Sequence, residues 1–131
     1  DIPGTVYFDP ELDCLSKYYL EKPECRKYFV LWNNDEVCGG IGFAEFEGFE
    51  NCAGIQKFYL ADNVKGIGWG RKLFSLAEKE AVKSGYRRLY IETHTNFELA
   101  LQMYLRHGYR QIDKPLSVSH CAMNSFLIKD L

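Results

Sequence analysis

The sequence lacks the features that mark membrane proteins and nucleic-acid-binding proteins. No apolar run approaches the roughly 20 residues of a membrane-spanning helix, and residues 1–10 do not resemble a signal peptide. Neither sign of charge dominates, because 16 Lys and Arg stand against 18 Asp and Glu, for a net charge of −2. The basic residues are scattered, so we expect no nucleic-acid or membrane-surface partner.

Paired cysteines, repeats and low-complexity segments are also missing. The five cysteines are odd in number, have no Cys-x-x-Cys spacing and mostly sit inside apolar runs. This usage favours buried, reduced thiols in a cytoplasmic protein over disulfides or a zinc site. The cysteines are Cys14, Cys25, Cys38, Cys52 and Cys121.

The apolar content is enough for one hydrophobic core. With 131 residues, of which 47% are apolar, we expect residues 1–131 to form a single domain. Asp9 and Pro10 are typical of the start of a helix, and Gly85 and Gly108 of helix ends. The patterns predict helices over residues 9–20, 68–84 and 96–107, and strands over residues 27–32, 37–46, 53–60, 88–93, 109–112 and 121–128.

The most informative segment lies between a strand-like run and a helix-like run. Residues 65–71 read Lys-Gly-Ile-Gly-Trp-Gly-Arg, with glycines at alternate positions. Glycines let the backbone approach an anion, and a helix that starts near Gly68 points its unpaired N–H groups at the loop. The segment therefore predicts a phosphate-binding loop with pyrophosphate as its occupant, although an ordinary tight turn between strand and helix is the structural alternative.

The glycine spacing excludes two common nucleotide-binding loops. A dinucleotide motif needs its third glycine where this chain has Arg71 or Leu73. A Walker loop, counted from Gly66, needs Gly, Lys and Ser or Thr where this chain has Arg71, Lys72 and Leu73. The segment resembles instead the acyl-CoA loop of the GCN5-related N-acetyltransferase (GNAT) superfamily, Arg/Gln-x-x-Gly-x-Gly/Ala.

A second motif downstream resembles the same superfamily. It is a helix that carries Asn, Ala and Tyr and ends in Gly-Phe or Gly-Tyr, here Asn96, Ala100, Tyr104, Gly108 and Tyr109. The resemblance runs from about residue 36 to residue 131. It implies an α/β (α+β) fold, with a mixed central sheet flanked by helices.

The resemblance also implies an activity. The chain would transfer an acetyl group from acetyl-CoA, without a metal, to a primary amine of a small molecule or peptide. The amine would attack the thioester directly in a ternary complex, with no covalent acyl-enzyme. The sequence does not determine the oligomeric state, so a homodimer stays open.

One departure from the superfamily concerns the beginning of the chain. Members normally have a strand and a helix before the helix that we expect at residues 9–20. The sequence begins at Asp1 without Met, and nothing in it indicates these two elements. We therefore expect the first strand and helix to be absent, which leaves open whether the protein itself lacks them.

By motif position, the resemblance implies a set of cofactor-binding residues. The loop residues Lys65, Gly66, Ile67, Gly68, Trp69, Gly70 and Arg71 would hold the pyrophosphate. Main-chain N–H groups of Phe58 and Leu60, on a splayed strand, would reach the thioester and pantetheine. Asn96 would bond to the cofactor arm. The structural alternatives are core packing for Phe58 and Leu60, and a helix cap for Asn96.

The resemblance assigns an acid but no base. Tyr104 would give a proton to the departing thiolate, and its alternative is a helix-packing tyrosine. Many relatives carry Glu near the position of Gly54, and here there is only Gly. Our first choice for the base is Glu92, because the carboxyl ends of strands border the ligand crevice in open α/β sheets. The other candidates are Glu45, Glu47, His94 and a water chain.

Two further alternatives remain. A catalytically degenerate domain that binds acyl-CoA for sensing or structure would keep the loop and lose turnover. A thiol hydrolase built on Cys121 and His120 is disfavoured, because neighbouring residues on a strand point to opposite faces. Acidic residues of the hairpin, Glu45, Glu47 and Glu50, would suit a cationic acceptor, although such charges are usually just solvated.

Overall fold

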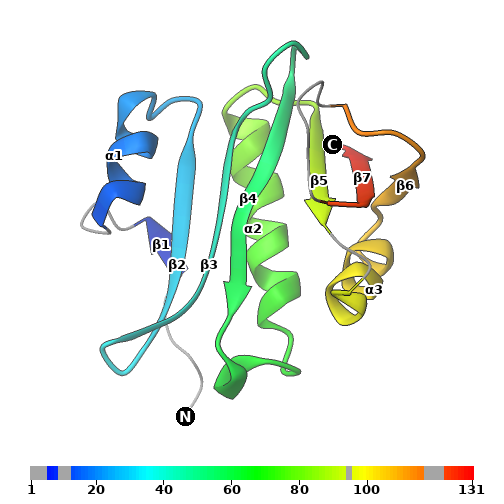
Figure 1. The fold of residues 1–131 in the computed structure, drawn as a ribbon. Coiled ribbons are helices and arrows are strands. Elements are labelled where there is room, and N and C mark those ends of the chain that lie inside the picture. Colours follow the sequence, from blue (N-terminus) through cyan, green and yellow to red (C-terminus); the bar gives the residue numbers. More distant parts are fainter. Residues whose placement is uncertain (1–5, 9–12, 94–95, 117–122) are drawn as a thin grey trace.

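The computed structural model describes residues 6–8, 13–93, 96–116 and 123–131. Within them the strands form one seven-stranded sheet in the order β1-β2-β3-β4-β5-β7-β6 (Figure 1). Neighbouring strands are antiparallel except β4 and β5, which are parallel. The strands are β1 (Val6–Phe8), β2 (Lys27–Asn33), β3 (Glu36–Glu45), β4 (Cys52–Leu60), β5 (Arg88–Thr93), β6 (Arg110–Ile112) and β7 (Ser125–Asp130).

The helices are close to their predicted positions. They are α1 (Asp13–Glu21), α2 (Trp69–Lys83) and α3 (Glu98–Arg106), with a short 3-10 helix, η1 (Asp62–Val64), before α2. The mixed sheet flanked by helices confirms the predicted fold class. The last strand differs, because β7 begins at Ser125 rather than at residue 121. Within the described ranges, no helix has the length and apolar character needed to cross a membrane.

The prediction that the first strand is absent is wrong. Strand β1 pairs antiparallel with β2, with Val6 opposite Leu31 and Phe8 opposite Phe29. Three residues are too few to give a readable alternating pattern, so the sequence did not reveal this edge strand. Asp9 and Pro10, which were predicted to begin the first helix, lie outside the described residues.

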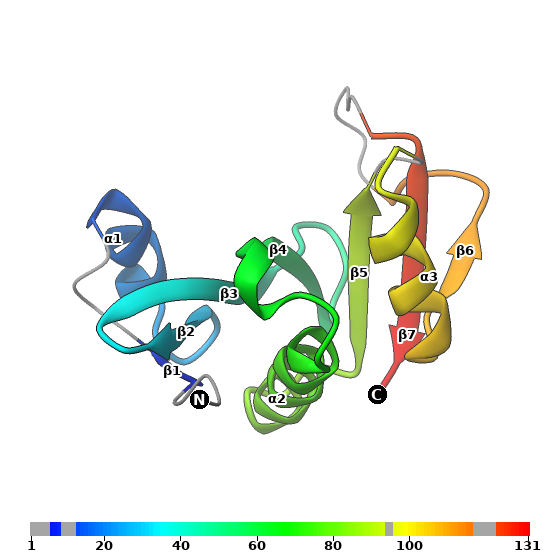
Figure 2. The same cartoon turned by 90° about the horizontal axis from the view of Figure 1, so that it is seen from below.

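Helices cover the two faces of the sheet, with α1 and α2 on opposite sides (Figure 2). On the α1 side, Tyr19 packs against Tyr28 and Val30 of β2. On the other side the main core joins the sheet to α2 and α3 and includes Phe29, next to Tyr28 in sequence. This alternation along β2 is the period of two expected of a strand that is buried on both faces.

Candidate functional site

Strands β4 and β5 diverge before residues 58–60, for which the resemblance implies a splayed strand. Their parallel ladder pairs Cys52 with Arg88, Ala53 with Leu89 and Gly54 with Tyr90, and the described residues form no further pair between them. Strand β4 nevertheless continues to Leu60. Figure 1 shows the two strands separating towards their carboxyl ends. Among the described residues, the second half of β4 therefore pairs with β3 only, and we call this gap in the pairing of β4 with β5 the opening.

A β-bulge reshapes this half of β4. Gly40 of β3 pairs with Tyr59 and Gly42 pairs with Gln56, so two residues of β4 stand opposite one residue of β3. Lys57, one of these two, has a positive φ of 50°. A bulge of this kind bends its strand and re-aims the side chains that follow.

The bulge explains how Phe58 and Leu60 reach the core. In a regular strand Ile55 and Phe58 would point to opposite faces, because side chains alternate. Here Ile55, Phe58 and Leu60 all pack against the core cluster that contains the buried residues of α2. Nothing in the Gln56-Lys57-Phe58 sequence signals this change, because the bulged residue is Lys rather than Gly.

The glycine-rich loop connects η1 to α2 beside this opening. Gly66 and Gly68 have positive φ values of 80° and 93°, a region that favours glycine. Gly68 is the N-cap of α2 and provides no side-chain cap, so the first N–H groups of the helix have no such partner. A Cβ on either glycine would meet nothing within 4 Å. An open loop with unpaired N–H groups at a helix start fits the pyrophosphate of acetyl-CoA.

The third glycine of the loop has a different environment. Gly70 is buried, and a Cβ at this position would lie only 2.7 Å from Sδ of Met103 on α3. The same Cβ would lie 3.5 Å from Leu60 and 3.6 Å from Phe58. The missing side chain of Gly70 thus lets α2 lie close to α3 and β4. Met103 was not singled out from the sequence, because its contact depends on how the two helices pack.

The loop side chains point in several directions. Trp69 is only 8% exposed and packs in a small cluster, so only its main chain is available to a ligand. Ile67 is 59% exposed, and Arg71 is exposed as well. Lys65 forms an ion pair with Asp62, with Nζ and Oδ1 3.1 Å apart. The Trp69 cluster consists of Leu31, Cys38, Val64 and Trp69.

Tyr104 lies near Phe58 in the core between α2, α3 and β4. Its ring centroid is 6.4 Å from that of Phe58 and 5.2 Å from that of Phe74 on α2. The side chain is 6% exposed, and burial raises its pKa to about 12. Among the described residues, no hydrogen bond to the Tyr104 hydroxyl is formed. Phe74 was overlooked in the sequence, although its spacing of four residues from Gly70 places it on the buried face of α2.

Glu92 lies at the carboxyl end of β5, beside the opening. Its Oε2 accepts a hydrogen bond from the Tyr90 hydroxyl at 2.7 Å, and that hydroxyl accepts one from the backbone N–H of Leu116 at 3.1 Å. Tyr90 packs in one hydrophobic cluster, whereas its neighbour Ile91 packs in the main core under α2. Because side chains alternate along β5, Glu92 faces the side of the sheet opposite Tyr104.

Asn96 is not the N-cap residue of α3. The N-cap residue is Phe97, and Asn96 is an exposed residue that precedes it. The helix begins later than predicted, so Asn96 stands one residue before the cap position. The expected contact with the cofactor arm stays a prediction.

Glu45 is held by an ion-pair network away from the opening. Arg26 donates from Nε and Nη2 to the two carboxylate oxygens, at 2.8 Å each, and Lys22 donates to Oε2 at 3.1 Å. These hydrogen bonds, chiefly those from Arg26, lower the pKa of Glu45 to about 2. Glu45 pairs with Ala53 near the start of β4, at the end away from the loop. This position argues against Glu45 as the base, while His94, His120 and Cys121 lie outside the described residues.

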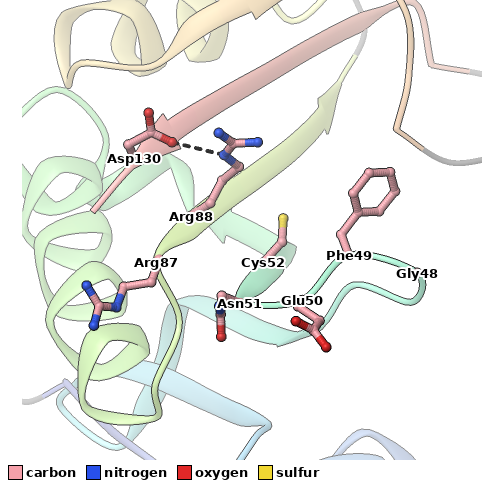
Figure 3. Close-up of a pocket in the computed structure, with 8 residues that line it drawn as sticks. All are labelled: Gly48, Phe49, Glu50, Asn51, Cys52, Arg87, Arg88 and Asp130. Carbon is pink, nitrogen blue, oxygen red and sulfur yellow. Dashed lines mark hydrogen bonds and ion pairs between the residues drawn. The ribbon is translucent and has the colours of Figure 1, made fainter.

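A hollow on the surface lies at this same end of the sheet (Figure 3). It forms where β4 and β5 begin, whereas the glycine-rich loop follows the end of β4. Arg88 and Asp130 form an ion pair of 2.9 Å within it. Glu50 lines this hollow rather than the loop, and the exposed Glu47 lies in the adjacent turn. The lining residues are Gly48, Phe49, Glu50, Asn51, Cys52, Arg87, Arg88 and Asp130.

The described residues include free thiols but no candidate metal site. The part of the chain that the structure describes contains no group of three His, Cys, Asp or Glu side chains that could hold a metal ion. Cys38 and Cys52 are buried free thiols, as expected, and Cys25 is half-buried and free. Cys121 and the surroundings of Cys14 are outside the description.

Comparisons with known proteins agree with this architecture. Residues 1–109 match the Acetyltransferase (GNAT) family. Over 114 residues the chain is 32% identical to the uncharacterized N-acetyltransferase YjgM of Escherichia coli K12, which covers 86% of this chain and 67% of YjgM.

Two solved structures share the fold. A GNAT-family acetyltransferase of Staphylococcus aureus Mu50 superposes with a TM-score of 0.78 at 22% identity, covering 92% of this chain and 76% of that one. The structure of yncA from Salmonella typhimurium, which contains its cofactor acetyl-CoA, superposes with a TM-score of 0.77 at 16% identity, covering 96% and 92%.

Proposed function

Because the chain belongs to the Acetyltransferase (GNAT) family and is an acetyl-CoA-dependent N-acetyltransferase, we propose that it acetylates a primary amine of a small molecule or peptide. The amine attacks the thioester directly while both substrates are bound. The observation that carries this proposal is the end of the β4–β5 ladder at Gly54 and Tyr90, which opens the sheet beside the glycine-rich loop. Glu92 and Tyr104 flank this opening on opposite faces of the sheet.

The cofactor is held mainly by main-chain groups. The N–H groups of residues 66–71 bind the pyrophosphate, and the exposed side chains of Lys65 and Arg71 balance its charge. Main-chain groups of Phe58 and Leu60 face the thioester end. Bound acetyl-CoA supplies the activated acetyl thioester. The open space around Gly66 and Gly68, where a Cβ would meet nothing within 4 Å, supports this arrangement.

Glu92 removes the proton that keeps the acceptor amine from attacking. A carboxylate at the end of β5 lies at the mouth of the opening, and the Tyr90 hydroxyl fixes one of its oxygens. The neutral nitrogen then forms a bond to the acetyl carbon while the carbon–sulfur bond breaks and CoA leaves as the thiolate. The nitrogen loses a second proton as the amide forms, and this proton passes to water. Glu92, as the base, takes the role that the missing carboxylate at Gly54 has in many relatives.

Tyr104 donates a hydrogen bond to the sulfur as it leaves. Its pKa of about 12 keeps the hydroxyl protonated at every pH at which the enzyme is expected to work. This pKa exceeds that of an ordinary thiol, about 8.5, so complete proton transfer to the sulfur is uphill. Tyr104 therefore acts chiefly by stabilising the thiolate, and any proton it gives up is recovered from water.

A transfer assay tests the proposal. The purified chain is mixed with acetyl-CoA and a panel of polyamines, aminoglycosides, amino acids and peptides, and released thiol is measured together with the mass of each product. We expect at least one primary amine to gain a single acetyl group. Acetyl-CoA binding without transfer to any amine, in the native chain and at every pH tested, would favour the degenerate acyl-CoA-binding alternative.

The single domain and the compartment are also part of the proposal. Free thiols at Cys25, Cys38 and Cys52 support a reducing, cytoplasmic environment. One sheet that is shared by all the described strands supports a single domain over residues 1–131.

A further inference from the structure

A charged cluster ties the end of α3 to α2 and β7. Its centre is Glu78 of α2, whose Oε2 accepts a hydrogen bond from the Tyr109 hydroxyl at 2.9 Å. Lys129 of β7 donates to both Glu78 oxygens, at 3.0 and 3.1 Å. Nε2 of His107 lies 3.4 Å from Oε2 of Glu78. One carboxylate thus contacts three residues from two other parts of the fold, the end of α3 and β7.

The cluster also fixes the backbone at the end of α3. Lys129 donates to the carbonyl oxygen of His107 at 2.8 Å, which satisfies a carbonyl that the helix leaves without a partner. The N–H of Tyr109 donates to the carbonyl of Tyr104 at 3.0 Å. The residues that Glu78 holds by their side chains are therefore bonded directly to the turn that carries Tyr104.

Ring contacts provide a second connection between α2 and Tyr104. Phe74 lies one helical turn before Glu78, and its ring centroid is 5.2 Å from Tyr104, 5.8 Å from Tyr109 and 6.2 Å from His107. Glu78 and Phe74 thus contact α3 and the residues after it from the same face of α2. These contacts set the position of Tyr104 relative to α2, whose first turn belongs to the proposed cofactor site.

The side chains of this cluster are shielded from water. The side chain of Glu78 is 15% exposed, and those of His107 and Lys129 are 12% and 25% exposed. Removing one partner of a shielded ion pair leaves the other charge uncompensated. The residues around such a pair are therefore displaced more than those around an exposed pair.

We infer that Glu78 is a positioning residue that holds Tyr104 at the sulfur of the cofactor through Tyr109, His107 and Lys129. The inference rests on the proposed role of Tyr104. Glu78 itself does not touch the reacting atoms. Misplacement of a catalytic group by about 1 Å can cost up to about 100-fold in rate, so the cluster is expected to affect turnover more than cofactor affinity.

The test begins with Glu78→Gln, which keeps the side-chain size and removes the charge. We expect kcat for acetyl transfer to fall by about 10-fold while KM for acetyl-CoA stays within about 2-fold. Glu80→Gln is the matched control, because Glu80 lies on the same helix and pairs with Lys83 at 3.3 Å. This control is expected to leave both constants unchanged. Circular dichroism and the melting temperature report the fraction of each variant that is folded.

A double-mutant cycle separates positioning from general structural damage. In a Tyr104→Phe background, Glu78→Gln is expected to change kcat by less than about 2-fold, because the group that it positions is gone. An equal loss in both backgrounds would overturn the inference and leave the role of Tyr104 standing. If Tyr104→Phe alone has no effect on kcat, the proposed role of Tyr104 fails instead.

A milder variant keeps the inference testable if Glu78→Gln does not fold. Tyr109→Phe removes only the hydroxyl that donates to Glu78, and the superfamily motif accepts Phe at this position. We expect a smaller loss of kcat that again disappears in the Tyr104→Phe background. If Tyr109→Phe folds and its kcat is unchanged, the inference is overturned, whether or not Glu78→Gln folds.

Discussion

Gly54 of β4 and Tyr90 of β5 form the last backbone pair of the parallel ladder, and beyond them the two strands part. The absence of a side chain at Gly54 leaves room above this pair, where a Cβ would meet only the ring of Phe46, at 3.5 Å. The Tyr90 hydroxyl instead reaches forward to Glu92. Tyr90, at the end of the ladder, thus orients the Glu92 carboxylate that we propose as the base.

Glu92→Gln should lower kcat by about 100-fold or more, because general-base catalysis typically contributes 10²–10⁴-fold. The loss should shrink as the pH approaches about 10, where a growing fraction of a lysine-like amine has lost its proton in solution. The measurement is the pH dependence of kcat for both proteins. Tyr90→Phe, which keeps Glu92 and removes its hydrogen-bond donor, should cost less than Glu92→Gln. Equal rates in wild type and Glu92→Gln at neutral pH would exclude Glu92 as the base.

Gly68→Ala should weaken acetyl-CoA binding by about 10-fold. An alanine in the left-handed region costs roughly 1–2 kcal/mol, which here disturbs the loop geometry that a ligand needs. Gly48→Ala is the matched control, since Gly48 has a similar φ of 88° and equally open surroundings at the far end of the sheet. Both variants should lose similar thermal stability, and only Gly68→Ala should lose affinity. Equal affinities in the two variants would contradict the loop assignment.

Tyr104→Phe should lower kcat by about 10- to 100-fold and leave the Kd for CoA nearly unchanged, because the lost hydrogen bond forms with the leaving sulfur. The raised pKa gives this prediction a pH signature. The protonated, active form persists until the pH rises through about 12, so Tyr104 should cause no fall in kcat below about pH 11. A decline of wild-type kcat near pH 9 that disappears in Tyr104→Phe would contradict this account.

Glu45→Gln should lower stability at pH 7 by about 1 kcal/mol, because its pair with Arg26 is partly open to solvent and therefore screened. The folded-state pKa of Glu45 is about 2, below the unfolded value of 4.5. Its contribution is therefore complete above about pH 4.5 and is lost as the pH falls through 2. Denaturant unfolding of both proteins at pH 7, 4 and 2 measures this difference.

The control for this stability prediction is Glu80→Gln, which removes an i,i+3 pair with Lys83 on α2. Such a pair contributes little, so we expect a smaller change in unfolding free energy at pH 7. The contrary result is a parallel loss of stability in wild type and Glu45→Gln between pH 4.5 and pH 2. It would show that Glu45 does not cause the loss of stability at acid pH.

Elements with strong local signals were predicted well. Strand β5 matches its predicted range of 88–93, and α2 differs from its prediction by one residue at each end. Gly68 and Gly85 mark these ends of α2 through their positive φ values, and such signals are local. The short strand β1 was missed, because its existence depends on pairing with β2.

The geometry of the candidate site depended on contacts that no local pattern encodes. The bulge at Lys57, which turns Phe58 and Leu60 towards α2, involves a residue type without preference for a positive φ. Gly70 was assigned to the phosphate loop by its spacing, and its buried position against Met103 became visible only once α2 and α3 were packed together. Glu78 carries no motif, because its partners come from distant parts of the chain.

The most direct test of the central claim is calorimetric titration of the folded chain with acetyl-CoA, CoA, ATP and NAD. We expect saturable binding of acetyl-CoA and CoA to one site per chain, with ATP and NAD far weaker, because the loop spacing and the opening beside β4 suit an acyl-CoA. Absence of CoA binding by a chain whose circular dichroism and cooperative unfolding show that it is folded, or equal binding of ATP or NAD, would contradict the central claim.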